Sequence, residues 1–185
     1  MDQIDKLAHT AATSPLNNIP EPSIESKKSG NYKKGKLNFQ GLSISIENPK
    51  GSVRSGIGYN GKKWKNKLHS HYGYLRSTIG KDKDHLDVFI GPDHKSDIVV
   101  IINQNNIDNG NFDEHKIALG FSTFNDAIKG YLANYDKDWE KKGGIRSAYR
   151  LNMDEFKNWL KNGNTRTEFK GIPKTITELY LEKIL

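Results

Sequence analysis

The middle of the chain carries the alternation of apolar and polar residues that is typical of half-buried β-strands. Apolar side chains recur at strand-like intervals at Leu37, Phe39, Leu42, Ile44 and Ile46. We expect Gly41 to mark a bulge or kink within this stretch, and Asn60-Gly61 to form a two-residue hairpin turn. Further strands, separated by clusters of turn residues, are predicted at Tyr72–Thr78, Leu86–Ile90, Ile98–Asn103 and Lys116–Phe121.

The pattern becomes helical after Phe121. An apolar stripe at three- and four-residue intervals follows a capping residue, Ser122 or Thr123, and predicts a helix to about residue 134. Asn152 and Glu155 form a capping-box pattern that predicts a second helix. The sequence therefore predicts an α+β protein with a small OB-like β-barrel core and C-terminal helices.

The two ends of the chain differ from this central region. Residues 1–29 are rich in Ser, Pro and Asn, and beyond a short helix near residues 4–12 they show no periodic apolar pattern. We expect them to form a flexible N-terminal tail, residues 30–165 the barrel domain, and residues 166–185 a C-terminal helix.

Composition excludes several classes of chemistry. The chain has no Cys, which rules out disulfides, thiolate zinc sites and a Cys nucleophile. Its longest apolar runs have the length of a strand, and the N-terminus lacks the pattern of a secretory signal. We therefore expect a cytoplasmic protein, of a bacterium or a phage-infected host, without a membrane partner.

Charge is divided between two parts of the chain, although the net charge is +7. From Gly30 to Lys67 there are nine basic residues and one acid, whereas from Asp82 to Glu114 there are eight acids and two lysines. One part is suited to anions and the other to cations. Solvated surface charge is the alternative explanation for both clusters.

The segment that begins at Tyr72 contains the most informative pattern. Asp82, Asp84 and Asp87 fall in a turn that leads into a predicted strand, so that their carboxylates can converge at one mouth. Mg²⁺ binds hard oxygen ligands of this kind. An Asp-rich turn, in which the side chains cap their own backbone, is the alternative.

The surroundings of these acids resemble soluble Mg²⁺-dependent inorganic pyrophosphatases. The run 82–88 matches the three acids and the two aliphatic residues of that family's signature, and departs from it at Lys83 and His85. Tyr72-Gly73-Tyr74 lies ten residues ahead of the first acid, as the family's Tyr-Gly-Tyr does.

A closer resemblance rests on four segments of the chain, namely Asn31–Gly35, Ile46–Ser52, Asp87–Pro92 and Phe112–Lys116. These segments resemble the pyrophosphatase-like domain of bacteriophage polyvalent proteins. That group has His at the position of His85 and usually Gly at the position of Lys83.

The resemblance implies a role for each of a larger set of residues. It implies catalysis by Asp84, which accepts a proton from the attacking water, and by Tyr72, while Gly56 stands where the family has a further acid. The implied metal ligands are Asp82, Asp87, Glu114, Asp113 and Asp108. The implied substrate-binding residues are Glu47, Arg54, Lys63, Lys116, Tyr135 and Lys137. The loop length leaves open which of Asp108 and Asp113 faces the metal.

Two functions are compatible with these patterns. The favoured one is Mg²⁺-dependent hydrolysis of a phosphoanhydride, with pyrophosphate as the small phosphorylated substrate and Mn²⁺ as an alternative metal. The other is an inactive phage or mobile-element module that binds nucleotide or nucleic acid through the lysines around Trp64. Gly56, Lys83 and His85 favour the second. A homo-oligomer is compatible with either.

Overall fold

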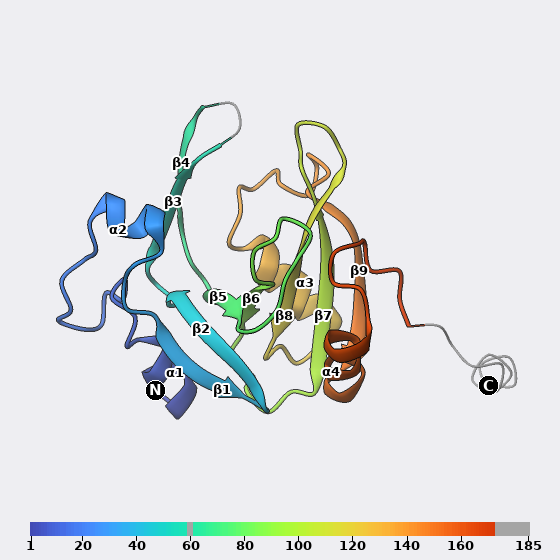
Figure 1. The fold of residues 1–185 in the computed structure, drawn as a ribbon, viewed down its shortest axis with the longest axis horizontal. Helices are drawn as coiled ribbons and strands as arrows, with labels where there is room; N and C mark the ends of the chain where they lie inside the picture. Colours follow the sequence, from blue (N-terminus) through green and yellow to red (C-terminus); the bar gives the residue numbers. More distant parts are fainter. Residues whose placement is uncertain (59–60, 173–185) are drawn as a thin grey trace, which may run out of the picture.

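A computed structural model describes residues 1–58 and 61–172, which form an α+β protein built mostly of β-sheet (Figure 1). No helix in this part of the chain is long and apolar enough to cross a membrane. The helices and strands in chain order are α1 (Gln3–Ala8), α2 (Ile24–Ser29), β1 (Gly35–Phe39), β2 (Leu42–Asn48), β3 (Val53–Ile57), β4 (Lys63–Lys67), β5 (His71–Leu75), β6 (Asp87–Ile90), β7 (Ile98–Asn105), β8 (Phe112–Leu119), α3 (Phe124–Leu132), β9 (Ile145–Asn152) and α4 (Met153–Asn162).

Seven strands form one open sheet in the order β1-β2-β5-β6-β8-β7-β9. Neighbouring strands within this sheet run antiparallel, except β6 and β8, which run parallel. Within the described residues β1 and β9 are the two edges, so the sheet does not close into a barrel, although it is compatible with an OB-like fold. Strands β3 and β4 pair only with each other and form a hairpin that stands away from the main sheet (Figure 1).

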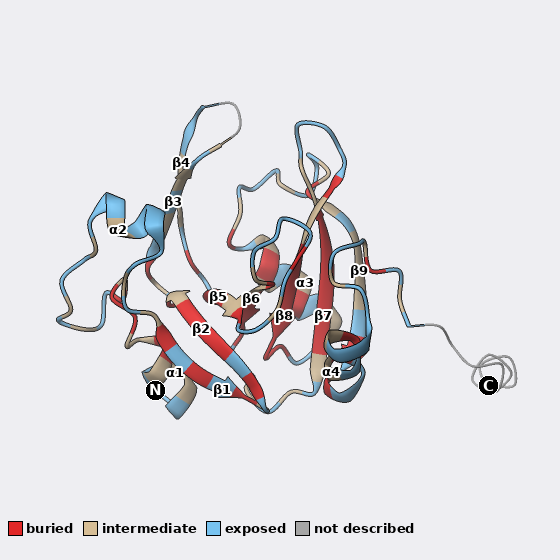
Figure 2. Ribbon diagram, in the orientation of Figure 1, coloured by how far each residue is buried: buried red, intermediate tan, exposed pale blue. Residues whose placement is uncertain are grey.

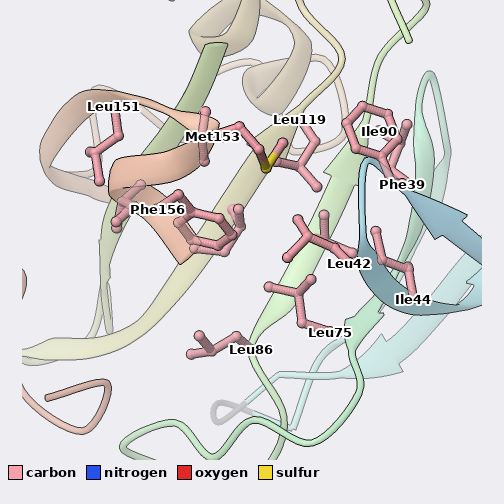
Figure 3. Packing of buried hydrophobic residues seen from close by; sticks show 14 of the residues in the cluster. Phe39, Leu42, Ile44, Leu75, Leu86, Ile90, Leu119, Leu151, Met153 and Phe156 are labelled. Atoms are coloured by element: carbon pink, nitrogen blue, oxygen red, sulfur yellow. The ribbon is translucent and has the colours of Figure 1, made fainter. Parts of the chain in front are cut away.

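Each face of the sheet buries its own apolar cluster, as the alternation along the strands requires. One cluster joins the sheet to α1 and α4 and includes Ala8 of α1. Figure 3 shows Ile44, Leu75 and Phe156 of this cluster. The other joins the opposite face to α3. Figure 2 shows the buried residues running along the central strands. The central strands β6, β7 and β8 are therefore covered on both faces.

The two helices predicted after Phe121 that lie in the described residues are confirmed. Thr123 caps α3, and its side chain accepts a hydrogen bond from the backbone N–H of Asp126. At the start of α4, Asn152 and Glu155 form the predicted capping box. The predicted C-terminal helix has no helical residue between 166 and 172, and the rest of it lies outside the described residues.

The structure corrects the role of Gly41 and adds strands that the pattern did not predict. Phe39 pairs with Leu42, so Gln40 and Gly41, both with positive φ, form a two-residue hairpin turn, and the bulge lies between Ile46 and Asn48. Strand β9 is an edge strand with little buried surface, which explains its weak apolar pattern.

The sequence predicts that residues 1–29 lie outside the core, but in the structure part of this segment is buried in it. Ala8 and Ala11 are fully buried, and α1 packs against β1, where Gly35 lets the Ala8 carbonyl approach closely. The His71 ring bonds the Asp5 carboxylate at 2.8 Å. Alanines are small enough to pack closely here without producing the long apolar stripe that sequence patterns detect. The domain boundaries themselves stay a prediction.

Deleting residues 1–14 is expected to lower the melting temperature by at least about 5 °C. The deletion removes Ala8 together with the partly buried Ile4 and Leu7 from the cluster under β1, and burial of a few such side chains contributes several kcal/mol. Differential scanning calorimetry measures the shift, with Lys6→Ala on the exposed side of α1 as the control. An unchanged melting temperature would show that the segment is not part of the folded unit.

Candidate functional site

The register of the sheet brings the central acidic and basic side chains together. Tyr74 of β5 lies opposite Asp87 of β6, and Asp87 lies opposite Lys116 of the parallel strand β8. Because side chains alternate along a strand, Tyr72 and Glu114, each two residues away, point to the same face. Residues from three strands therefore meet on the face that α3 partly covers.

Lys116 is the centre of this cluster. Its Nζ lies 2.5 Å from Asp87 Oδ2 and 2.8 Å from Glu114 Oε2, and it also donates to the Tyr72 hydroxyl at 3.4 Å. The Tyr72 hydroxyl in turn donates to Asp87. The Lys116 side chain is only 3% exposed. One buried ammonium thus neutralises part of the charge of two carboxylates.

The surroundings fix the protonation of this cluster. Burial opposes a charge on Lys116, but Asp87 and Glu114 outweigh it and hold the Lys116 pKa well above its usual value. Burial raises the pKa of Glu114, against the attraction of Lys116, and it also raises the pKa of the Tyr72 phenol, so that Tyr72 remains a hydrogen-bond donor.

Arg54 reaches the cluster from the β3–β4 hairpin. Its guanidinium carbon lies 4.2 Å from the centre of the Tyr72 ring and 5.4 Å from that of Trp64. A Cβ at Gly56 would lie 2.5 Å from the Trp64 ring, so the indole occupies the space where the resembled family has an acid. The hairpin therefore supplies a cation and an aromatic wall in place of a carboxylate.

A glutamine that the sequence analysis did not single out organises the other side of the cluster. Gln104 on β7 donates from Nε2 to Glu114 at 2.9 Å. Its Oε1 accepts from the hydroxyls of Tyr131 at 2.7 Å and Tyr135 at 2.8 Å. The sequence offered one signal for this role, because Gln104 is a polar residue that continues the strand face of the apolar Val100 and Ile102. Tyr135, predicted to bind substrate, bonds this amide.

A cavity of about 740 Å³ opens beside these residues, between the β3–β4 hairpin and the loop that joins β7 and β8. Three of the predicted basic residues line it, namely Arg54, Lys63 and Lys116. Three predicted metal ligands, Asp108, Asp113 and Glu114, also line the cavity, as does Tyr135, which was predicted to bind substrate. The cavity thus joins residues from the basic and the acidic parts of the sequence.

Three further residues singled out in the sequence do not line this cavity. Glu47 is partly buried on β2 and accepts a hydrogen bond from the Tyr32 hydroxyl at 3.3 Å, and burial, with the nearby Asp87 charge, raises its pKa. Lys137 is exposed in the turn after α3, and the cavity wall does not include it. Lys83 is exposed at φ +71°, a conformation that favours glycine.

Asp82 and Asp84 lie exposed on the loop between β5 and β6. Oδ1 of Asp82 accepts from the backbone N–H of Asp84 at 3.1 Å, and Oδ1 of Asp84 accepts from that of His85 at 2.7 Å. In the part of the chain that the structure describes, these two carboxylates and Asp87 form no group of ligands within 4.8 Å of one another. Their shared metal site stays a prediction.

The donor chemistry of the cavity nevertheless fits a hard divalent cation. Asp108, Asp113 and Glu114 line the cavity and offer carboxylate oxygens, and Asp87 bonds the same Lys116 ammonium as Glu114. Mg²⁺ and Mn²⁺ take oxygen ligands of this type and retain several waters. Lys116 already bonds two of these acids, so a cation would share them with the ammonium.

Comparison with known proteins gave two results. Residues 24–161, well over half of the chain, match the family model described as Inorganic Pyrophosphatase. Among solved structures, the fold is similar to a crystal structure of an inorganic pyrophosphatase from Neisseria gonorrhoeae, with 16% identity and a TM-score of 0.41 over 69% of this chain and 94% of that one. No curated protein matches the chain.

Proposed function

The chain belongs to the inorganic pyrophosphatase family, and on that premise we propose that it hydrolyses a phosphoanhydride, with inorganic pyrophosphate as the preferred substrate and Mg²⁺ as the cofactor. The single observation that carries the proposal is the Lys116 cluster on the cavity wall. In it one buried ammonium bonds two carboxylates, and a phenol donates to one of the two; Lys116 and Glu114 are the members that line the cavity.

Hydrolysis of pyrophosphate needs negative charge to be neutralised and a proton to be removed from water. Arg54, Lys63 and Lys116 supply positive charge around the cavity. The phenols of Tyr72 and Tyr135 donate to Asp87 and to the Gln104 amide oxygen, and so hold these groups in position. Asp84, exposed on the neighbouring loop, would accept the proton.

The metal would be held by the oxygens of Asp87, Asp108, Asp113 and Glu114, with Asp82 as a further ligand from the loop. When bound, it supplies charge neutralisation on phosphate and a lower pKa for bound water. The chain's own residues orient the substrate, and the Tyr72 phenol and the Gln104 amide hold Asp87 and Glu114 in place.

One observation favours a second function, a binding module without hydrolysis. The Lys116 ammonium already pairs with Asp87 and Glu114, and the Trp64 ring fills the space beside Gly56. A site neutralised from within depends less on a metal. Such a protein would bind phosphorylated ligands in the cavity and release no phosphate.

The test is phosphate release from pyrophosphate with Mg²⁺ or Mn²⁺, beside a panel of nucleotides. Asp84→Asn is expected to lower turnover by about 10²–10⁴-fold, the usual contribution of a general base. Because Asp84 is exposed, the melting temperature of the Asp84→Asn protein should stay within about 1 °C of that of the parent.

Two controls separate the candidate functions. Lys161→Gln, on the exposed surface of α4, should leave turnover unchanged. If the parent releases phosphate and the Asp84→Asn protein releases it equally fast, Asp84 is not the general base. If the parent binds pyrophosphate in calorimetry but releases no phosphate with either metal, the hydrolase proposal is wrong and the binding module replaces it.

A further inference from the structure

A second cavity lies on the same side of the sheet, near its β1 edge. Its volume is about 580 Å³, and its wall combines residues from the chain before β1 with one residue each of β1, β2 and β5 and with the residue directly after β5. Four of the side chains that line it are basic, namely Lys33, Lys34, Lys36 and Arg76. The proposed function uses none of these four.

The positive charge of this cavity is not neutralised by ion pairing. Within residues 1–58 and 61–172, no carboxylate forms a salt bridge with any of the four cations. Lys34 instead donates to the Gly30 carbonyl at 2.7 Å and lies 4.4 Å from the centre of the Tyr32 ring. Glu47 on β2 accepts from the Tyr32 hydroxyl, and burial raises its pKa, although the positive charge of Lys34 acts in the opposite direction.

Two tyrosines, a serine and a threonine, Thr10, complete the wall. Ser45 is buried and lies opposite both Lys36 on β1 and Tyr74 on β5. Tyr74 stacks on His85, with ring centres 4.7 Å apart and an angle of 10° between the planes. This contact fixes the Tyr74 ring beside the loop that carries Asp84. Hydroxyl groups and cations that converge in one hollow are typical of phosphate recognition.

The register connects this cavity directly with the Lys116 cluster. Lys36, Ser45, Tyr74, Asp87 and Lys116 are successive partners on five neighbouring strands, so they form one row across the sheet. Neighbouring strands are about 4.8 Å apart, which places Lys36 about 14 Å from Asp87 along this row. Inorganic pyrophosphate contains only two phosphate groups and is too short to occupy both ends.

We propose that the second cavity binds a phosphate group of a substrate longer than pyrophosphate, whose scissile end lies at the Lys116 cluster. The chemical class is a phosphoanhydride chain of three or more phosphates, either inorganic or attached to a nucleoside. The location of the scissile end rests on the proposed function, whereas phosphate binding by Lys33, Lys34, Lys36 and Arg76 does not.

The test is equilibrium binding by titration calorimetry in metal-free buffer, where hydrolysis does not interfere. The probes are pyrophosphate, inorganic tripolyphosphate and adenosine 5′-triphosphate. The variant is Lys36→Gln/Arg76→Gln, which removes two charges from the cavity without introducing acids. Lys157→Gln/Lys161→Gln on α4, which covers the other face of the sheet, removes the same charge as a matched control.

The expected result is a change in selectivity. The cavity variant should bind tripolyphosphate at least tenfold more weakly than the parent, while its Kd for pyrophosphate stays within twofold and the control variant matches the parent for all three probes. A parallel loss for adenosine 5′-triphosphate identifies nucleoside polyphosphates as ligands, and a loss confined to tripolyphosphate identifies inorganic chains.

Two results would overturn the proposal. Unchanged tripolyphosphate binding by the cavity variant would show that its lysines and arginine are only solvated charges, and equal losses for tripolyphosphate and pyrophosphate would show a general electrostatic effect. A melting temperature of the cavity variant equal to that of the parent would show that unfolding is not the cause of weaker binding. Pyrophosphate turnover, measured separately, distinguishes the two proposals, because a chain without turnover can still show the selective loss.

Discussion

Lys116→Met is expected to lower the free energy of unfolding by about 3–5 kcal/mol at pH 7, the usual cost of leaving buried charges without a partner. The substitution keeps the length of the side chain and removes the ammonium that lies 2.5 Å from Asp87 and 2.8 Å from Glu114. Urea denaturation followed by circular dichroism measures the loss. Turnover of pyrophosphate, the proposed activity, should fall with it, because the cavity loses its buried cation.

The loss should depend on pH in one direction. Burial already raises the pKa of Glu114 above its unfolded value, and removing Lys116 raises it further. A carboxyl whose pKa is raised on folding contributes stability at low pH that is lost as the pH rises through the folded-state pKa. The deficit of Lys116→Met should therefore be smaller at pH 5 than at pH 8.

Lys63→Met is the matched control for this experiment. Lys63 lines the same cavity but lies exposed on the hairpin, so its replacement should change the free energy of unfolding by no more than about 0.5 kcal/mol. A comparable loss in both variants, or a Lys116→Met protein as stable as the parent at pH 8, would contradict the buried ion cluster.

Gly73→Ala is expected to be more damaging than any surface substitution, with a loss of about 3 kcal/mol or more, or no folded protein at all. A Cβ at this position would overlap the Ser45 carbonyl oxygen and lie 2.7 Å from the Ile46 Cα. Both atoms belong to the backbone of β2, so the strands can accommodate the methyl group only by separating.

Gly110→Ala is the comparison variant without a steric clash. Gly110 has φ +70°, and its added Cβ would meet no atom within 4 Å, so alanine there has only the conformational cost of about 1–2 kcal/mol. Chemical denaturation of both variants gives the comparison. Equal losses at the two positions would show that β2 and β5 do not approach as closely as described.

The central strands and the capped helices could be predicted from the sequence because their side chains alternate or repeat with a clear period. Thr123 and the Asn152–Glu155 pair show this for the helices, since capping depends on neighbouring residues alone. The open edges of the sheet could not be predicted, because closure depends on the partners of β1 and β9. Likewise, the packing of Ala8 under β1 depends on contacts distant in the sequence.

The candidate site shows the same division. The resemblance led to Asp87, Glu114, Lys116 and Tyr72, and the structure brings these four together. It did not lead to Gln104, whose role depends on the pairing of β7 with β8 and on the position of α3. Exposed loop acids such as Asp84 are placed by the loop backbone, which a sequence pattern describes poorly.

The parallel pairing of β6 with β8 has a consequence for how the protein acquires its chemistry during folding. Asp87 and Lys116 become neighbours only when β8 lies beside β6, and β7 lies between them in the chain. Contacts of this separation carry a loop-closure cost and form slowly. Until then both groups remain hydrated, and the cluster loses its water only when β8 pairs with β6. An intermediate without β8 in place therefore has no site.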